Sequence, residues 1–224
     1  AGVLSGTLVY NVSGNSIQNV GQVAAAVGAV TSGFSGSARG RVQANTVGAS
    51  AVQGSCGQTG LEVRGDGSGT HVSEVTNNVL YSCRDLAISV TADGATARHD
   101  AVVRGNSATT VPNPSAPNSE TFRANVESGT LCLAAGHPTN PADKNRLDHR
   151  IVPAGSHDLV VDFDGPSPAS LILEGYTGAP NDRTAATNFL RNSNDYIGGG
   201  PANVAILSAP AGTTITAGTC LRPW

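Results

Sequence analysis

Short stretches in which apolar and polar residues alternate recur along the whole chain, separated by glycine, proline, asparagine, aspartate and serine. A period of two residues is typical of strands that bury one face, and the intervening residues favour turns. We therefore expect an all-β protein, either an antiparallel β-sandwich or a partly open barrel, with one or two short helices. The predicted strands cover residues 3–12, 39–47, 61–64, 79–83, 86–91, 97–104, 121–126, 130–134, 157–163, 170–176, 204–207 and 213–221.

Two stretches have a helical pattern. Residues 17–30 place valines three and four residues apart, but Gly21 and Gly28 each disfavour a helix interior, so a pair of short strands is an alternative. Residues 182–191 form the second stretch. Either Asn181 or Asp182 is a good N-cap at its start.

The proline-rich segment at residues 112–117 leaves the domain organisation open. Three prolines within six residues favour an extended path without amide donors. The chain is either a single β-rich domain over residues 1–224, or an N-terminal β module (1–111) linked to a C-terminal β module (118–224). The sequence shows no clear internal repeat.

Composition points to a secreted protein. The chain has no methionine, a single lysine (Lys144), 28 glycines and only 13% charged residues. Its net charge of -3 gives no reason to expect a nucleic-acid partner, and no stretch is apolar for the 18 or so residues of a membrane helix. The start at Ala1 suits a mature product after signal removal, although loss of an initiator methionine would leave the same sequence. We expect the protein to be secreted or at the cell surface.

The four cysteines predict disulfide bonds. They contain no CxxC pair, and no histidine lies at a zinc-ligand spacing from any of them. The order along the chain favours Cys56 with Cys83 and Cys132 with Cys220. In the chain-entropy model each bond stabilises the fold by about 3 to 4 kcal/mol. Such bonds persist in an oxidising compartment.

Three aspartates near residue 160 are candidate metal ligands. Strand alternation places Asp158, Asp162 and Asp164 on one face, opposite His157, Leu159, Val161 and Phe163. Clustered carboxylates suit calcium, although an acidic strand face that only keeps the protein soluble explains the same pattern. No other cofactor is predicted.

The histidines give no clear sign of catalysis. Neighbours such as His99 and Asp100 point to opposite faces of a strand, and no G-x-S-x-G motif presents a nucleophile. A secreted hydrolase that uses His137, His149 or His157 with aspartate or serine partners is therefore a third alternative. The sequence favours a non-enzymatic role.

The N-terminal stretch suggests assembly between copies. Leu4, Leu8, Tyr10 and Val12 share one face of a strand near the chain end. That face either covers the chain's own sheet or adds to the open sheet of another subunit. The second possibility makes these four residues the assembly strand.

We expect an extracellular structural or adhesive subunit of a surface filament, sheath or layer, which forms a homo-oligomer or polymer by strand complementation. The alternative from another class is a secreted carbohydrate-binding module. Its candidate ligand-binding side chains are the aromatics Tyr176, Tyr196 and Trp224 with the polar residues Asn181, Asp182, Asn192, Asn194 and Asp195.

Overall fold

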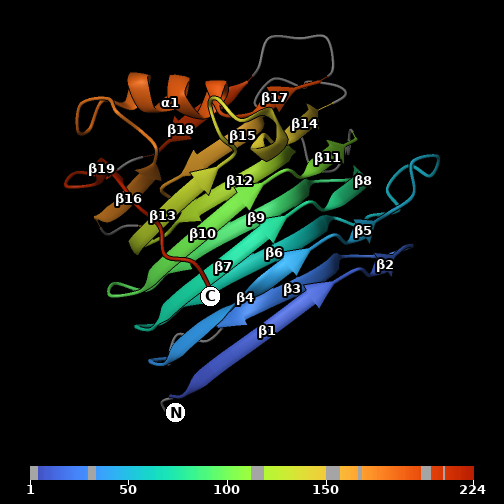
Figure 1. The fold of residues 1–224 in the computed structure, drawn as a ribbon, viewed down its shortest axis with the longest axis horizontal. Coiled ribbons are helices and arrows are strands. Elements are labelled where there is room, and N and C mark those ends of the chain that lie inside the picture. Colours follow the sequence, from blue (N-terminus) through green and yellow to red (C-terminus); the bar gives the residue numbers. More distant parts are fainter. Residues whose placement is uncertain are drawn as a thin grey trace.

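The chain winds into a parallel β-helix, in which each coil adds one strand to each of three sheets (Figure 1). The computed structural model describes residues 5–29, 34–111, 119–149, 157–165, 168–197, 203–208 and 210–224. The predicted proline-rich linker at residues 112–117 and Leu4 lie outside these ranges.

The three sheets are named here by number. Sheet I has seven strands: β1 (Thr7–Ser13), β4 (Ser37–Gln43), β7 (Thr70–Thr76), β10 (Arg98–Arg104), β13 (Gly129–Ala135), β16 (Ala169–Glu174) and β19 (Thr214–Gly218). Sheet II has six: β2 (Ser16–Ile17), β5 (Thr46–Val47), β8 (Val79–Cys83), β11 (Ser107–Thr110), β14 (Arg146–His149) and β17 (Asp195–Tyr196). Sheet III also has six: β3 (Val23–Ala29), β6 (Thr59–Asp66), β9 (Leu86–Asp93), β12 (Glu120–Val126), β15 (His157–Asp162) and β18 (Val204–Leu207).

The prediction of an antiparallel sandwich or barrel is wrong, because the paired strands of all three sheets are parallel. Parallel sheets are usually covered on both faces, and the sequences of their strands are then continuous apolar runs. Here strands such as β4 and β16 bury mainly their inner face, so they alternate in the manner of an antiparallel sheet, whereas β9, β10 and β15 are buried on both faces. The chain returns to the start of each parallel strand through the other two sheets of the coil rather than through a helix.

Apolar side chains from successive coils stack into columns inside the β-helix. One column of sheet I runs through Val12, Val42, Val75, Val103 and Ala135, which are register partners on neighbouring strands. The corresponding column of sheet III contains Leu61, Ile88, Phe122, Leu159 and Val204. Apart from Val12, the members of both columns are buried, and they form one continuous core.

A second kind of column is polar and follows the turn between sheets I and II. It consists of one asparagine per coil: Asn15, Asn45, Asn78, Asn106, Asn145 and Asn194. Each side-chain amide donates to the Oδ1 of the next asparagine at 2.8 or 2.9 Å. The ladder satisfies polar groups that the turn buries, which would otherwise be costly.

The two ends of the β-helix differ. Helix α1 (Arg183–Asn192) lies across the last coil (Figure 1), where Ala186 and Leu190 are buried. The Asp182 side chain accepts from the Ala185 amide, which confirms the predicted helix and cap. The described residues 17–29 form no helix; they contain the end of β2 and the whole of β3, as the alternative of short strands predicted.

The structure contains the disulfide pairs Cys56–Cys83 and Cys132–Cys220, which the chain order favoured. The first ties the loop after β5 to the end of β8.

A short 3-10 helix, η1 (Pro141–Asp143), precedes β14. Strand pairings continue across residues 112–118, since β12 pairs with β9 and β13 with β10. Over the described residues, no helix has the length and apolar character needed to cross a membrane.

Candidate functional site

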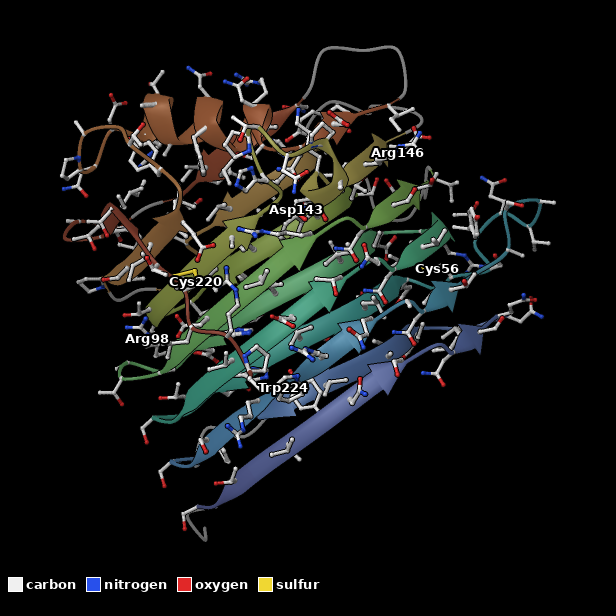
Figure 2. The ribbon with its side chains drawn as sticks, in the orientation of Figure 1. Cys56, Arg98, Asp143, Arg146, Cys220 and Trp224 are labelled. Atoms are coloured by element: carbon white, nitrogen blue, oxygen red, sulfur yellow. A yellow bond between two sulfur atoms is a disulfide. The ribbon has the colours of Figure 1, made fainter. Side chains whose placement is uncertain are left out.

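The outer face of sheet I carries an exposed tryptophan beside two arginines. Successive outward positions place Val9 and Asn11 on β1, Arg39 and Arg41 on β4, and Glu74 on β7. The Trp224 side chain lies over these strands (Figure 2), and its ring centroid is 4.3 Å from Cζ of Arg41. We call these six residues the Trp224 face.

A C-terminal strap, residues 219–224, brings the tryptophan to this position. After β19 the chain crosses the outer face of sheet I (Figure 1), where the Cys220–Cys132 disulfide fixes it to β13. The Leu221 amide then donates to Oδ1 of Asp100 at 3.0 Å. Cys220 of the strap forms a small buried apolar cluster with Val102, Cys132 and Ala134 of sheet I, so packing also holds the strap in place.

Charged contacts reinforce the strap. Both oxygens of Glu174 accept from the Arg222 guanidinium, and Oε2 also accepts from the Cys220 amide at 2.9 Å. Arg104 donates to the same carboxylate at 2.9 Å. Burial alone raises the pKa of Glu174, but these donors outweigh it and hold the pKa below its usual value. The carboxylate therefore stays ionised and anchored at neutral pH.

The exposed part of the face has an aromatic ring and spare cationic groups. Trp224 is 53% exposed and Val9 is 55% exposed, so apolar surface is open to solvent. Arg41 donates through Nε to Glu74 at 2.6 Å. Among the described residues, Arg39 is exposed and forms no ion pair. Such a surface can stack a ring-shaped ligand and attract negative charge.

The predicted assembly strand forms the first rung of sheet I. Residues of β1 pair in parallel with β4 of the same chain, and both Tyr10 and Val12 pack on the core. The Tyr10 ring lies over Gly40, where a Cβ atom would collide with it. Leu8 is 42% exposed at the open end of the core. In the structure β1 therefore lies in the chain's own sheet, and assembly between copies through this strand stays a prediction.

The three candidate calcium ligands differ in burial, since Asp164 is exposed and the other two aspartates are buried. Leu159, Val161 and Phe163 face the core as predicted. Asp158 is buried, and its Oδ2 accepts from the Asn203 amide at 2.9 Å. Asp162 is also buried and lies near Arg123.

Burial raises the pKa of Asp162, and the neighbouring Asp164 raises it further, while Arg123 opposes both. Within the described ranges, only Asp100, Cys132 and Cys220 bring three possible ligand atoms within 4.8 Å of one another, and that group holds a disulfide. Calcium at the aspartates stays a prediction.

The hydrolase residues do not assemble into a reactive site in the described part of the chain. His137 is partly exposed, and its Nδ1 accepts from the amides of Thr139 and Asn140. His157 is partly buried, and it lies near Arg123 and near Asp162, the last residue of its own strand β15. The side chain of His149 is outside the described set.

Sequence reasoning missed a serine and histidine pair in the core. Ser73 Oγ lies 2.8 Å from Nε2 of His99, whose Nδ1 bonds to the Thr91 carbonyl. Both side chains are fully buried, so no substrate reaches them. The register pairing of His71 with His99 stacks their rings, and the Tyr10 hydroxyl bonds to His71.

Most of the predicted carbohydrate-binding residues instead hold the C-terminal end together. Tyr176 is buried and donates to the Ala179 carbonyl, and Tyr196 donates to the Leu190 carbonyl. Asn194 ends the asparagine ladder and Asp182 caps α1. Trp224 alone of the three aromatics is exposed. Its arginine neighbours were missed, although Arg39-Gly40-Arg41 has the spacing of two side chains on one strand face.

These features define a disulfide-bonded parallel β-helix with an open, partly cationic face beside an exposed aromatic ring. Two disulfides and the all-β fold suit an extracellular protein. Comparison with protein-family models, with curated proteins and with solved structures finds no match.

Proposed function

We propose that this protein is an extracellular, adhesive carbohydrate-binding protein that holds glycans on the Trp224 face. The observation that supports this role is the exposed Trp224 ring, which the strap brings to the outer face of sheet I beside Arg41. The C–H face of a sugar packs well on an aromatic ring, and neighbouring polar groups then orient its hydroxyls. Asn11 and Arg39 provide such polar groups at exposed positions.

The rigid support of the tryptophan favours binding over a merely structural contact. A side chain that is already fixed loses little conformational entropy when a ligand stacks on it. The Cys132–Cys220 bond, the Asp100 contact and the Glu174 contacts hold the strap just before Trp224, and the ring itself lies against Arg41. These anchors lie on β10, β13 and β16, so they leave β1 and β4 uncovered.

A glycan array followed by titration calorimetry tests the proposal. We expect Trp224→Ala to weaken binding at least about tenfold, because central aromatic contacts carry much of the affinity of an interface. Leu221→Ala, which changes another exposed residue of the strap, is the matched control and should retain affinity. If no glycan binds, or if Trp224→Ala binds as tightly as Leu221→Ala, the face has another role.

A second candidate, a structural subunit, is favoured by the open edge of the first coil. β1, β2 and β3 each end their sheets, and Leu8 is exposed there. Edge strands of this kind pair readily with other chains. If two copies associate through this end, Leu8→Lys should abolish a dimer that sedimentation velocity detects, and Leu221→Lys should not. A wild-type protein that stays monomeric at all concentrations would exclude this role.

A further inference from the structure

The outer faces of sheets I and III differ in charge. Outward arginines of sheet I and its strap outnumber the acids, whereas the reverse holds on sheet III. The sheet I side carries Arg39, Arg41, Arg98, Arg104 and Arg222 with Glu74, Asp100 and Glu174. Sheet III carries Glu62, Asp66, Asp93 and Asp162 with Arg64 and Arg123. A net charge of -3 thus hides a cationic side of the molecule.

The acids on sheet I are already neutralised by arginines. Asp100 accepts from Arg98 at 2.7 and 2.9 Å, and Glu174 accepts from Arg104 and Arg222. Glu74 pairs with Nε of Arg41, whose terminal nitrogens have no hydrogen-bond partner among the described side chains. The charge left for a ligand is therefore positive, and it lies beside Trp224.

We propose that the Trp224 face selects anionic polysaccharides, whose sugars carry carboxylate or sulfate groups. This inference rests on the proposed function. Arg39 and Arg41 lie two residues apart on β4, so both guanidinium groups face the same side as the tryptophan ring. The ring stacks one sugar, and the arginines pair with the acidic groups of the polymer.

The geometry favours an extended polymer over a single sugar. Polar and apolar outward positions continue from β4 to Asn11 and Val9 on β1, about 5 Å away across the sheet. Nucleic acid is a weaker fit, because Trp224 is the single large exposed aromatic among the described residues, whereas a strand of bases stacks on several aromatic side chains.

Binding of alginate, dextran sulfate and neutral dextran of matched length to the intact protein tests the proposal. We expect the two anionic polymers to bind at least about tenfold more tightly than dextran, and their affinity to fall as salt is added. Arg39→Gln should weaken binding of the anionic polymers about three- to fivefold without affecting dextran. Arg39→Lys should retain most of the affinity, because it keeps the charge.

Arg146→Gln is the matched control, since Arg146 is exposed on β14, far from Trp224 (Figure 2). It should leave all affinities unchanged. If neutral dextran binds as tightly as the two anionic polymers and added salt does not weaken any of them, the selectivity is overturned while the proposed function stays intact. Binding of none of the polymers, with neutral glycans also negative on the array, would overturn both. Tighter binding of single-stranded DNA than of alginate would overturn the assignment to polysaccharides.

Discussion

Two histidines buried in the core make stability depend on pH. His71 and His99 stack with ring centroids 4.3 Å apart, and Tyr10 and Ser73 bond to their Nε2 atoms. Burial lowers the pKa of His99 to about 4, whereas the Thr91 carbonyl and Asp100 oppose this shift. Burial also lowers the pKa of His71, and the charge of a protonated His99 lowers it further. Both rings are therefore neutral in the folded protein at neutral pH.

The free energy of unfolding should fall as the pH falls from about 6.5 towards 4. An unfolded histidine gains a proton near pH 6.5, whereas folded His99 resists protonation down to about 4. The stabilisation by neutral His99 is complete above pH 6.5. Acidification to about pH 4 should lower the free energy of unfolding by about 3 kcal/mol. Urea unfolding at several pH values measures this slope.

His99→Gln should flatten the slope, while His137→Gln, which changes a partly exposed histidine outside the core, should leave it as in the wild type. Burial raises the pKa of Glu120 and of Asp162, so these acids favour the folded state as the pH falls. They oppose the histidines mainly at the acidic end, which makes the upper part of the range the more informative. A stability that stays constant between pH 7 and 5 would contradict the prediction.

At the scale of the elements, the asparagine ladder fixes the turn between sheets I and II in every coil. Asn106 shows the pattern: its Oδ1 accepts from the backbone and side-chain amides of Asn78. Its own amide group donates to Asn145 and to the Val75 carbonyl. One side chain therefore connects three coils.

Asn106→Ala should lower the free energy of unfolding by about 2 to 5 kcal/mol, because it leaves several buried partners unsatisfied. Asn15→Ala, at the exposed end of the ladder, should cost less than about 1 kcal/mol. Asn11→Ala, at an exposed position of β1, is the control without ladder contacts. Equal losses at Asn106 and Asn15 in urea unfolding would show that the ladder does not act as argued.

For the whole molecule, stability varies along the axis of the β-helix. Each coil contacts mainly its neighbours, as in other repeat architectures, so the middle coils gain support from two sides. The last coil is covered by α1, whereas β1, β2 and β3 are edge strands of the described sheets. The first coil is therefore the least supported.

Hydrogen exchange should follow this order. We expect amides of β1–β3 to exchange orders of magnitude faster than those of β7–β12. Val42→Ala should accelerate exchange in the first two coils, and Val103→Ala, in the same column, should accelerate it in the middle of the molecule. Uniform protection from the first coil to the last would contradict a stability gradient. Protection of β1 that rises with protein concentration would support association through this edge.

Strands were predictable where turn-forming residues bound a run clearly, as in β8, β10 and β18, which the expected ranges cover closely. Strand β7 was missed because His71, Ser73 and Glu74 give it a polar composition, although two of these side chains are buried. The asparagine turns did carry a signal, since an asparagine is followed two residues later by Ile17, Val47 and their counterparts. Unequal spacings of 30, 33, 28, 39 and 49 residues hide that repeat.

The sequence by itself determined that the chain forms β-strands with one buried face, that α1 begins after Asp182, and that four cysteines make two bonds in an oxidising environment. These properties depend on periodicity and local chemistry, which a single chain displays. Only the tertiary structure decided that the strands are parallel, and that Arg39, Arg41 and Trp224 share one face. A half-buried strand has the same alternation in either direction, and a contact between residues 41 and 224 depends on coil stacking and the strap.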